Sequence, residues 1–390
     1  MSAEGVSYRN HCTQGAKMKI TKLETFLVKP RWLFLKMHTD EGLVGLGEPI
    51  LEGRALTVAQ AVAELEPYLV GKDPTRVVYH WQAMYKHAFY RGGEILTSAL
   101  SGVEHALWDL TGQALGVPVY KLLGGPVRDR IKIYRGCGGA NPEEAAKAAK
   151  AAVAQGFIAL KTGVNGGRSA RIIESPAWVE RAVAQFAAMR AAVGNEIDIA
   201  IDFHGAVSPQ TSALLIKALE PFQPMFVEEP VQCQNVDALA DLARKTHIPI
   251  ATGERLFTKW GFREVLEKRA AAILQPDLAH AGGIFEGRII AGMAEAYYAG
   301  IAPHCPLGPI ALAACLQLDA SIPNFIAQEH ASLGEGYIKQ PFVLKDGYVD
   351  LPDKPGLGIE LDEAALADKI GHDWHNPALF HPDDGTPVDW

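Results

Sequence analysis

Six acidic or imidazole side chains recur at a nearly constant interval along the second half of this 390-residue chain. Each one follows a short apolar segment, and successive members are 26, 26, 23, 27 and 25 residues apart. The six residues are Asp202, Glu228, Glu254, Asp277, His304 and Glu329. A single carboxylate of this kind is often a helix N-cap or half of a core ion pair. Six in phase indicate a shared site.

The first three members are all carboxylates and are expected on neighbouring strands, so their side chains should converge. Asp202, Glu228 and Glu254 cannot lie together without a compensating positive charge. An all-oxygen ligand set favours Mg²⁺, with Mn²⁺ as a possibility, over zinc, which prefers His and Cys. Neutralisation by Arg255 and nearby lysines is the structural alternative. Glu229 should point away from the site because side chains alternate along an extended chain.

The histidines provide acid and base chemistry. Asp277 and His304 end neighbouring segments, and a carboxylate bound to one ring nitrogen raises the basicity of the other, so His304 is expected to be a general base. His204 follows Asp202 by two residues, should face the same side, and could be a general acid. We expect the remaining histidines to be structural or surface residues, among them His247, His280, His372, His375 and His381.

The elements that must position these groups alternate regularly from residue 131 onward. Short apolar segments predict strands at 131–134, 158–161, 197–203, 225–228, 248–252, 272–275, 301–304 and 325–328. The stretches between them predict helices at 142–155, 177–193, 209–219, 236–245, 259–268, 284–298 and 310–318. This alternation is typical of an α/β fold of the (β/α)8 barrel type, a modified TIM barrel, with its site at the carboxyl ends of the strands. Gly136-Cys137-Gly138-Gly139 does not match the G-x-G-x-x-G loop of a doubly wound sheet.

The rest of the chain predicts a second unit. Residues 18–50 alternate as a strand meander, and helices are expected at 55–69, 74–90 and 98–115. We therefore divide the chain into an α+β unit at 18–130, a barrel at 131–340, and a segment at 341–390 that returns to the first unit. That last segment has one short helix near 362–369. Residues 1–17 are expected to be a disordered extension outside the fold.

Composition excludes several classes of protein. The net charge is 37 − 45 = −8, which argues against nucleic-acid binding. Apolar residues make up 48% of the chain, but no apolar run reaches the roughly 18 residues of a membrane span. The five cysteines are odd in number and form no C-x-x-C, so a disulfide framework is not expected. These features fit a cytoplasmic protein with a small-molecule partner.

Several stretches of the sequence resemble a known family. They span residues 18–390 and include MKITKLETF, DEGLVGLGEP, DFHGAVS, FVEEPV, ATGERLF, ILQPDLAHAGGI and APHCPLGPIALAA. The chain resembles the mandelate racemase subgroup of the enolase superfamily, and within it is similar to D-galactonate dehydratases. The resemblance implies that the three carboxylates bind Mg²⁺, that His304 with Asp277 is the base, and that His204 is the acid. It also implies that Glu329 hydrogen-bonds the substrate carboxylate, that loops at 31–34 and 52–54 of a capping domain cover the site, and that the protein is a homo-oligomer.

One departure from the subgroup bears on the reaction. Racemases of this subgroup carry K-x-K after the second barrel strand, where this chain has Lys161-Thr162-Gly163. Because Gly163 cannot accept a proton, the sequence favours elimination, which needs one base and one acid, over two-base racemisation. We therefore expect a Mg²⁺-dependent dehydratase that converts a sugar acid, D-galactonate in the first instance, to a 2-keto-3-deoxy acid, with Lys161 binding the substrate carboxylate. The alternatives are gluconate or mannonate dehydration, epimerisation, a Schiff-base aldolase using Lys161, and a sugar-acid-binding protein with little or no activity.

Overall fold

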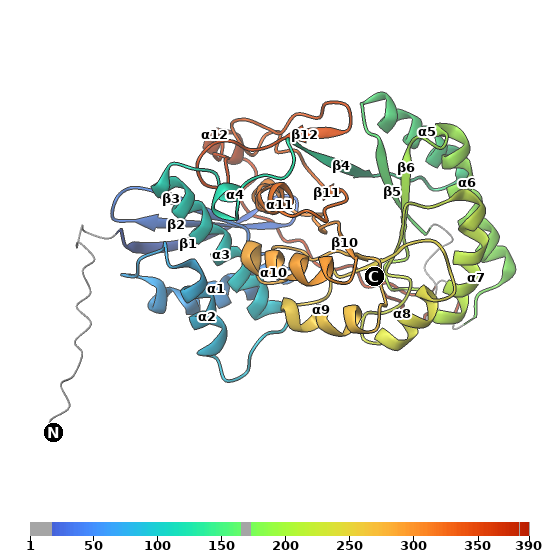
Figure 1. The fold of residues 1–390 in the computed structure, drawn as a ribbon, viewed down its shortest axis with the longest axis horizontal. Helices are drawn as coiled ribbons and strands as arrows, with labels where there is room; N and C mark the ends of the chain where they lie inside the picture. The colour runs from blue at the N-terminus through green and yellow to red at the C-terminus, as the bar shows by residue number, and fades with distance from the viewer. Residues whose placement is uncertain (1–17, 165–172, 382, 390) are drawn as a thin grey trace, which may run out of the picture.

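A computed structural model describes residues 18–164, 173–381 and 383–389, which form a small antiparallel sheet with its helices and a larger parallel barrel (Figure 1). The expectation for residues 1–17 falls outside this described part of the chain. Within it, no helix is both long and apolar enough to cross a membrane.

The N-terminal unit is a three-stranded meander covered by helices. Strands β1 (Ile20–Val28), β2 (Trp32–Thr39) and β3 (Val44–Gly47) are adjacent and antiparallel. They are followed by α1 (Ala55–Leu69), α2 (Val77–Lys86), α3 (Glu94–Leu115) and α4 (Val119–Leu122). Helix α2 is shorter than expected and α3 begins four residues earlier. The left-handed Gly93 (φ 79°) ends the preceding loop, so the helix can begin at once with Glu94, whose charge suits a helix N-terminus.

The barrel has the eight parallel strands expected from the sequence. They are β4 (Arg130–Gly136), β5 (Ala159–Gly163), β6 (Asp198–Asp202), β7 (Val227–Glu228), β8 (Ile250–Thr252), β9 (Ile273–Leu274), β10 (Gly300–Ile301) and β11 (Gln328–His330). Strands β4 to β10 follow one another in sequence order, and β11 pairs with β4. The remaining seam closes at the parallel bridge between Ile301 and Phe325. The predicted barrel fold is confirmed.

Seven helices connect these strands: α5 (Pro142–Ala154), α6 (Pro176–Val193), α7 (Pro209–Leu219), α8 (Val236–Ala243), α9 (Thr258–Glu267), α10 (Gly283–Glu295) and α11 (Pro309–Ser321). A short 3₁₀ turn, η1 (Glu220–Phe222), extends α7. Three of these helices begin with an N-cap residue followed by proline; the N-caps are Asn141, Ser175 and Ser208. The N-cap side chain accepts a hydrogen bond from a free backbone amide of the first turn, and proline suits the first helical position because its missing N–H has no partner there. After β11 the chain forms β12 (Tyr348–Asp350) on β4, and then α12 (Glu363–Leu366).

The barrel interior is filled by one buried residue in or directly beside each strand. These residues are Tyr134, Ala159, Ala200, Phe226, Ala251, Ile273, Ala302 and Ala327. Five of them are alanines, and the two largest side chains, Tyr134 and Phe226, meet edge to face with their ring centroids 6.2 Å apart. Side chains point inward at every second position of a strand, so the next inward layer lies two residues further toward the carboxyl ends.

Buried carboxylates of the N-terminal unit bind the backbone at the start of two barrel helices. Glu104 of α3 accepts hydrogen bonds from the amides of Ile284 and Phe285, in the first turn of α10. Glu48, just after β3, accepts from Gly308 and Ala311 at the start of α11. Helices α10 and α11 follow the two loops that carry Asp277 and His304. The N-terminal unit therefore holds the part of the barrel that bears the expected base.

The C-terminal segment packs on the N-terminal sheet, where α12 lies beside the blue strands (Figure 1). The amide of Lys29 donates to the carbonyl of Lys369 at 2.8 Å, and the amide of Gly371 donates to Leu27 at 2.8 Å. Further along, the Arg31 guanidinium lies over the Trp374 ring, 5.1 Å from its centroid. These contacts join the two ends of the described chain.

Candidate functional site

Five of the eight expected site residues occupy the inward layer directly above the barrel core. Lys161, Asp202, Glu228, His304 and Glu329 each stand two residues after one of the eight core residues. The same alternation that buries the core side chain therefore turns these polar groups into the barrel mouth. Three of the layer's eight positions hold Gly136, Gly253 and Gln275 instead.

The three carboxylates converge as the sequence predicted. Asp202 and Glu228 are direct partners in the register of β6 and β7. Glu254 reaches them by a different route, because β8 ends at Thr252 and Gly253 has φ +145°. An added Cβ at Gly253 would lie 2.8 Å from both the Gln275 nitrogen and the Phe262 ring, so this turn requires glycine.

One ligand oxygen from each of Asp202, Glu228 and Glu254 lies within 4.8 Å of the others. Burial raises the pKa of Asp202 and of Glu228 above their ordinary values, and each is raised further by neighbouring carboxylates. Such a group of crowded oxygens fits a divalent cation, which supplies the positive charge that keeps all three ionised.

Lys161 is the ammonium of this site. Its Nζ lies 2.9 Å from Glu228, 2.7 Å from Glu329 and 3.6 Å from Asp202. Burial alone would lower the pKa of Lys161, but the carboxylates outweigh it and raise the pKa well above the ordinary value. A Schiff-base lysine must be deprotonated to attack a carbonyl. The surroundings of Lys161 therefore disfavour the aldolase alternative and suit a fixed positive charge.

His304 and Asp277 form a hydrogen-bonded pair. His304 Nδ1 lies 2.8 Å from Asp277 Oδ2, and the other Asp277 oxygen accepts from the amide of Ala279 at 2.7 Å. Since a carboxylate accepts, Nδ1 is the donor and Nε2 faces the site, 3.4 Å from Glu254 and 3.9 Å from Glu329. Burial disfavours the charged ring, yet Glu254, Asp277 and Glu329 raise the pKa of His304 well above its ordinary value. A divalent cation bound by Glu254 would offset part of this negative charge and favour the neutral ring that a base requires.

His204 lies at the site, although not for the reason that the sequence suggested. Strand β6 ends at Asp202, and His204 has a left-handed backbone (φ 55°), so strict alternation no longer applies. Instead the amide of His204 donates to Asp202 Oδ1 at 2.6 Å, which holds the turn against the carboxylate trio. Glu229 is likewise left-handed (φ 38°), and its buried carboxylate pairs with Arg255 rather than with the trio.

Glu329 links three parts of the site. Its Oε1 pairs with Lys161, and its Oε2 accepts from the amide of Cys305 at 3.1 Å. Burial would raise the pKa of Glu329, but Lys161, His304 and these hydrogen bonds lower it to about 2. Glu329 is therefore a fixed anion beside the Lys161 ammonium.

Sequence reasoning gave no role at the site to one histidine that the structure places beside it. His280 was expected to be structural or a surface residue; it is buried, and its Nε2 lies 3.7 Å from Asp277 Oδ2. Its position three residues after Asp277, inside the ILQPDLAHAGGI stretch, is the only signal that could have found it. Glu52 of the N-terminal unit, whose Oε2 lies 3.6 Å from His280 Nε2, is not marked by any such sequence pattern.

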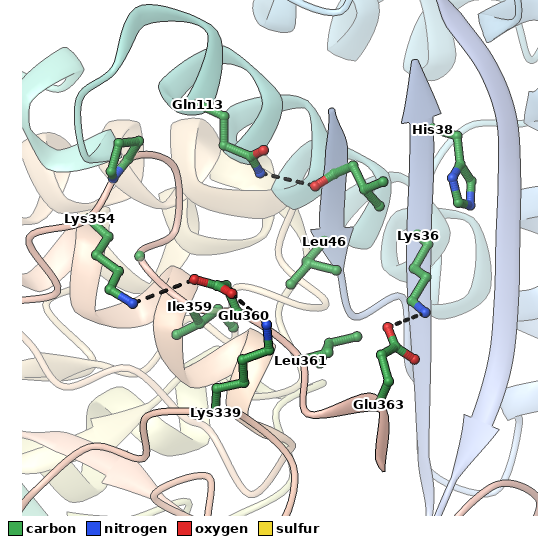
Figure 2. Close-up of a pocket in the computed structure, with 13 residues that line it drawn as sticks. Lys36, His38, Leu46, Gln113, Lys339, Lys354, Ile359, Glu360, Leu361 and Glu363 are labelled. Atoms are coloured by element: carbon green, nitrogen blue, oxygen red, sulfur yellow. Dashed lines mark hydrogen bonds and ion pairs between the residues drawn. The ribbon is translucent and has the colours of Figure 1, made fainter. Parts of the chain in front are cut away.

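A separate cavity of about 560 Å³ lies between β2, β3 and the C-terminal segment, away from the barrel mouth (Figure 2). Its lysines already pair with glutamates: Lys36 with Glu363, and Lys339 and Lys354 with Glu360. None of the expected site residues lines it. The barrel mouth is therefore the better candidate for the functional site.

Comparison with known proteins covers both units. Residues 16–124 match the family model of the mandelate racemase / muconate lactonizing enzyme N-terminal domain, and residues 143–365 match the enolase C-terminal domain-like model. The chain is 50% identical over 385 residues to a protein named D-galactonate dehydratase from Ralstonia nicotianae, covering 96% of this chain and 100% of the relative. It is 48% identical over 386 residues to one from Pectobacterium atrosepticum, with the same coverage.

Solved structures agree with this assignment of the fold. A member of the enolase superfamily from Salmonella Typhimurium superposes with a TM-score of 0.86 at 32% identity, covering 91% of this chain and 98% of that one. An enolase from Agrobacterium radiobacter, solved with bound Na and L-malate, superposes with a TM-score of 0.88 at 32% identity, covering 95% of this chain and 99% of that one.

Proposed function

The chain belongs to the mandelate racemase / muconate lactonizing enzyme family of the enolase superfamily, and from that premise we propose that it is a hydro-lyase that dehydrates D-galactonate to 2-dehydro-3-deoxy-D-galactonate. The observation that carries the proposal is that one candidate base, His304, is held in a fixed orientation by Asp277. His304 donates Nδ1–H to Asp277 and turns Nε2 into a mouth lined by carboxylates. The position where racemases of the subgroup have a second base is Gly163.

In this proposal His304 Nε2 removes the proton from C2 of the sugar acid. The electron pair of that C–H bond moves toward the C1 carboxylate, so negative charge grows there. Lys161, held as an ammonium between Glu228 and Glu329, is placed to stabilise that charge where it develops. Such general base catalysis typically contributes about 10²–10⁴-fold to the rate.

His204 completes the elimination by protonating the 3-hydroxyl, which leaves as water. The C2–C3 double bond forms as the C3–O bond breaks, and the resulting enol tautomerises to the 2-keto-3-deoxy acid. The hydrogen bond from the His204 amide to Asp202 fixes the backbone of the acid beside the carboxylate trio. Base and acid therefore belong to different turns, at 304 and 204.

Asp202, Glu228 and Glu254 would hold the metal ion, for which we propose Mg²⁺ because all three ligands are carboxylate oxygens. When bound, a divalent cation supplies Lewis-acid stabilisation of an oxygen anion without a proton transfer.

The test is an assay of the purified protein with Mg²⁺ against every hexonate and pentonate diastereomer, with semicarbazide detection of 2-keto-3-deoxy product. We expect one strong activity, on D-galactonate, that is lost in His304→Asn. Activity on another sugar acid alone would refute the substrate assignment and keep the mechanism. No product from any of them, with Mg²⁺ binding demonstrated by titration, would refute the dehydratase assignment.

Two further proposals concern assembly and location. We propose a homo-oligomer, supported by the aromatic loop between α2 and α3, where Phe89 and Tyr90 are 90% and 84% exposed. Light scattering on the purified protein tests this. We also propose a cytoplasmic location, supported by the free thiols of Cys137, Cys233, Cys305 and Cys315.

A further inference from the structure

A buried histidine outside the proposed catalytic set touches the carboxylate that orients the base. His280 lies in the turn after β9, and its side chain is 4% exposed. Its Nε2 is 3.7 Å from Asp277 Oδ2 and 3.6 Å from Glu52 Oε2. Asp277 belongs to the barrel and Glu52 to the loop between β3 and α1. The imidazole therefore lies between two carboxylates from different units.

The hydrogen bonds around the His280 ring indicate which of its nitrogens carry a proton. His280 Nδ1 is 3.0 Å from Ser98 Oγ, and that hydroxyl donates its only proton to the carbonyl of Glu94 at 2.6 Å. Ser98 Oγ must then accept from His280, so Nδ1 carries a proton. In a neutral ring Nε2 would point a lone pair at two carboxylates. A second proton on Nε2 turns both repulsions into attractions, so the geometry indicates an imidazolium.

The nearby His105 shows the opposite surroundings and provides a contrast. Its Nε2 binds the carbonyl of Leu278 at 2.8 Å, and burial lowers the pKa of His105 to about 4. For His280, burial also disfavours the charge, but Asp277 and Glu52 outweigh it and raise the pKa. The two buried histidines therefore differ in their contacts: His280 Nε2 lies within 3.7 Å of oxygens of the Asp277 and Glu52 carboxylates, whereas His105 Nε2 binds a neutral backbone carbonyl.

We propose that His280 is a positioning residue for the reaction: as an imidazolium it holds the Asp277 and Glu52 carboxylates on either side of its Nε2, and through Asp277 it fixes the tautomer and orientation of His304. This inference rests on the proposed function of His304 as the base. A positive charge on His280 also explains how the Glu52 carboxylate of the N-terminal unit can be buried beside His304 and Asp277. On its other side Glu52 Oε1 faces the Arg31 guanidinium at 3.7 Å, which in turn stacks on Trp374.

The charge of His280 can be measured without any assay of activity. In a long-range ¹⁵N–¹H spectrum of the full-length protein at pH 7.5, with and without Mg²⁺, both His280 ring nitrogens should have the shifts of an imidazolium. His105 should show one protonated and one unprotonated nitrogen in the same spectrum. The signal is assigned by its loss in His280→Asn, or by its shift in Glu52→Gln if the first variant does not fold. An unprotonated Nε2 in His280 overturns the proposal.

Kinetics of two variants then test the positioning role. In His280→Asn the side-chain NH₂ group can take the place of Nδ1 and still donate to Ser98 Oγ. In His280→Gln the side-chain NH₂ group can take the place of Nε2 and still donate to the Asp277 and Glu52 carboxylates. We expect His280→Asn to lower kcat by about 10–100-fold, the range seen when an outer-shell partner of a functional histidine is lost, with KM nearly unchanged. His280→Gln should retain more activity than His280→Asn, and the exposed control His247→Asn should match the wild type.

The outcomes separate this inference from the proposed function. If the wild type does not dehydrate any sugar acid, the proposed function fails, and the spectrum still decides the charge of His280. If the wild type is active but His280→Asn keeps its kcat, or Gln and Asn lose activity equally, His280 only fills space and the positioning role is refuted.

Discussion

Asp277→Asn should disable the base while leaving the barrel intact, because the structure determines how the new amide must sit. Asp277 Oδ1 accepts from the amide of Ala279 at 2.7 Å, so the carbonyl oxygen of asparagine takes that place. Its NH₂ group then occupies the position of Oδ2, 2.8 Å from His304 Nδ1. Two donors cannot face each other, so His304 changes to the tautomer with its proton on Nε2 and loses the lone pair that takes the C2 proton.

The same change of tautomer in a Ser-His-Asp triad lowers kcat by about 10⁴. Because the proposed base is one contributor among several here, we expect a loss of about 10³–10⁴-fold in kcat, or roughly 4–5.5 kcal/mol in the activation free energy. The assay is the semicarbazide measurement of initial rates on D-galactonate over a range of substrate concentrations. Circular dichroism and thermal melting verify that the variant is folded.

Asp109→Asn is the matched control for this experiment. Asp109 is equally buried and accepts from the amides of Leu46 and Leu357, at 2.8 Å each, but it lies in α3 away from the barrel mouth. Its replacement should lower the melting temperature and leave kcat unchanged. A general base typically contributes about 10²–10⁴-fold to the rate. If Asp277→Asn therefore keeps kcat within about tenfold of the wild type, the assignment of His304 as the base is wrong.

Four other predictions test the acid, the metal site, the pH dependence of stability and the packing of α3 against the loop after β3. His204→Asn should form no product but should still exchange the C2 proton for solvent deuterium, which NMR of recovered substrate detects; equal loss of exchange contradicts separate acid and base roles. Glu228→Gln should weaken Mg²⁺ binding in calorimetric titration by more than about 100-fold, since loss of an outer-shell partner alone costs up to that much. Because burial lowers the pKa of His105 to about 4, only the unfolded chain takes up its proton as the pH falls from about 6.5 to 4, so stability falls by up to about 3 kcal/mol in that window. His105→Gln should flatten this decline in urea unfolding at pH 7 and 4.5, and an unchanged slope would show that His105 is not the cause. Gly102→Ala should destabilise the fold by about 1–3 kcal/mol in thermal unfolding, because its Cβ would lie 2.2 Å from the Pro49 nitrogen; an unchanged melting temperature would mean that the two backbones are not in contact.

Much of the fold and the composition of the site follow from local pattern. The apolar segments near every 25 residues predicted all eight barrel strands, and the acidic or imidazole residues that follow six of them predicted most members of the candidate site. This works because parallel strands of one barrel have all their carboxyl ends at the same mouth. Alternation along β5, β6, β7 and β11 then places Lys161, Asp202, Glu228 and Glu329 inward without further information.

Other features depend on how the chain turns after a strand ends. Glu254 joins Asp202 and Glu228 only because Gly253 adopts a φ of +145°, and the turn that holds the His204 amide against Asp202 depends on the left-handed backbone of His204. Beyond the end of a strand, direction is set by turn geometry and by the atoms packed around it, so a period of two no longer predicts where a side chain points.

The contacts between the two units could not be read from the sequence at all. Glu48, Glu52 and Glu104 look like ordinary surface charges in a helical or loop context, yet all three bind barrel groups far along the chain. The surroundings of His280 were hidden for the same reason, since one of the two carboxylates beside its Nε2 is Glu52 of the other unit. The sequence alone determined which groups ring the barrel mouth, because the repeating β/α unit is a local property. The tertiary structure decided how His304 and Asp277 are held, because docking of the two units brings together side chains that no local period relates.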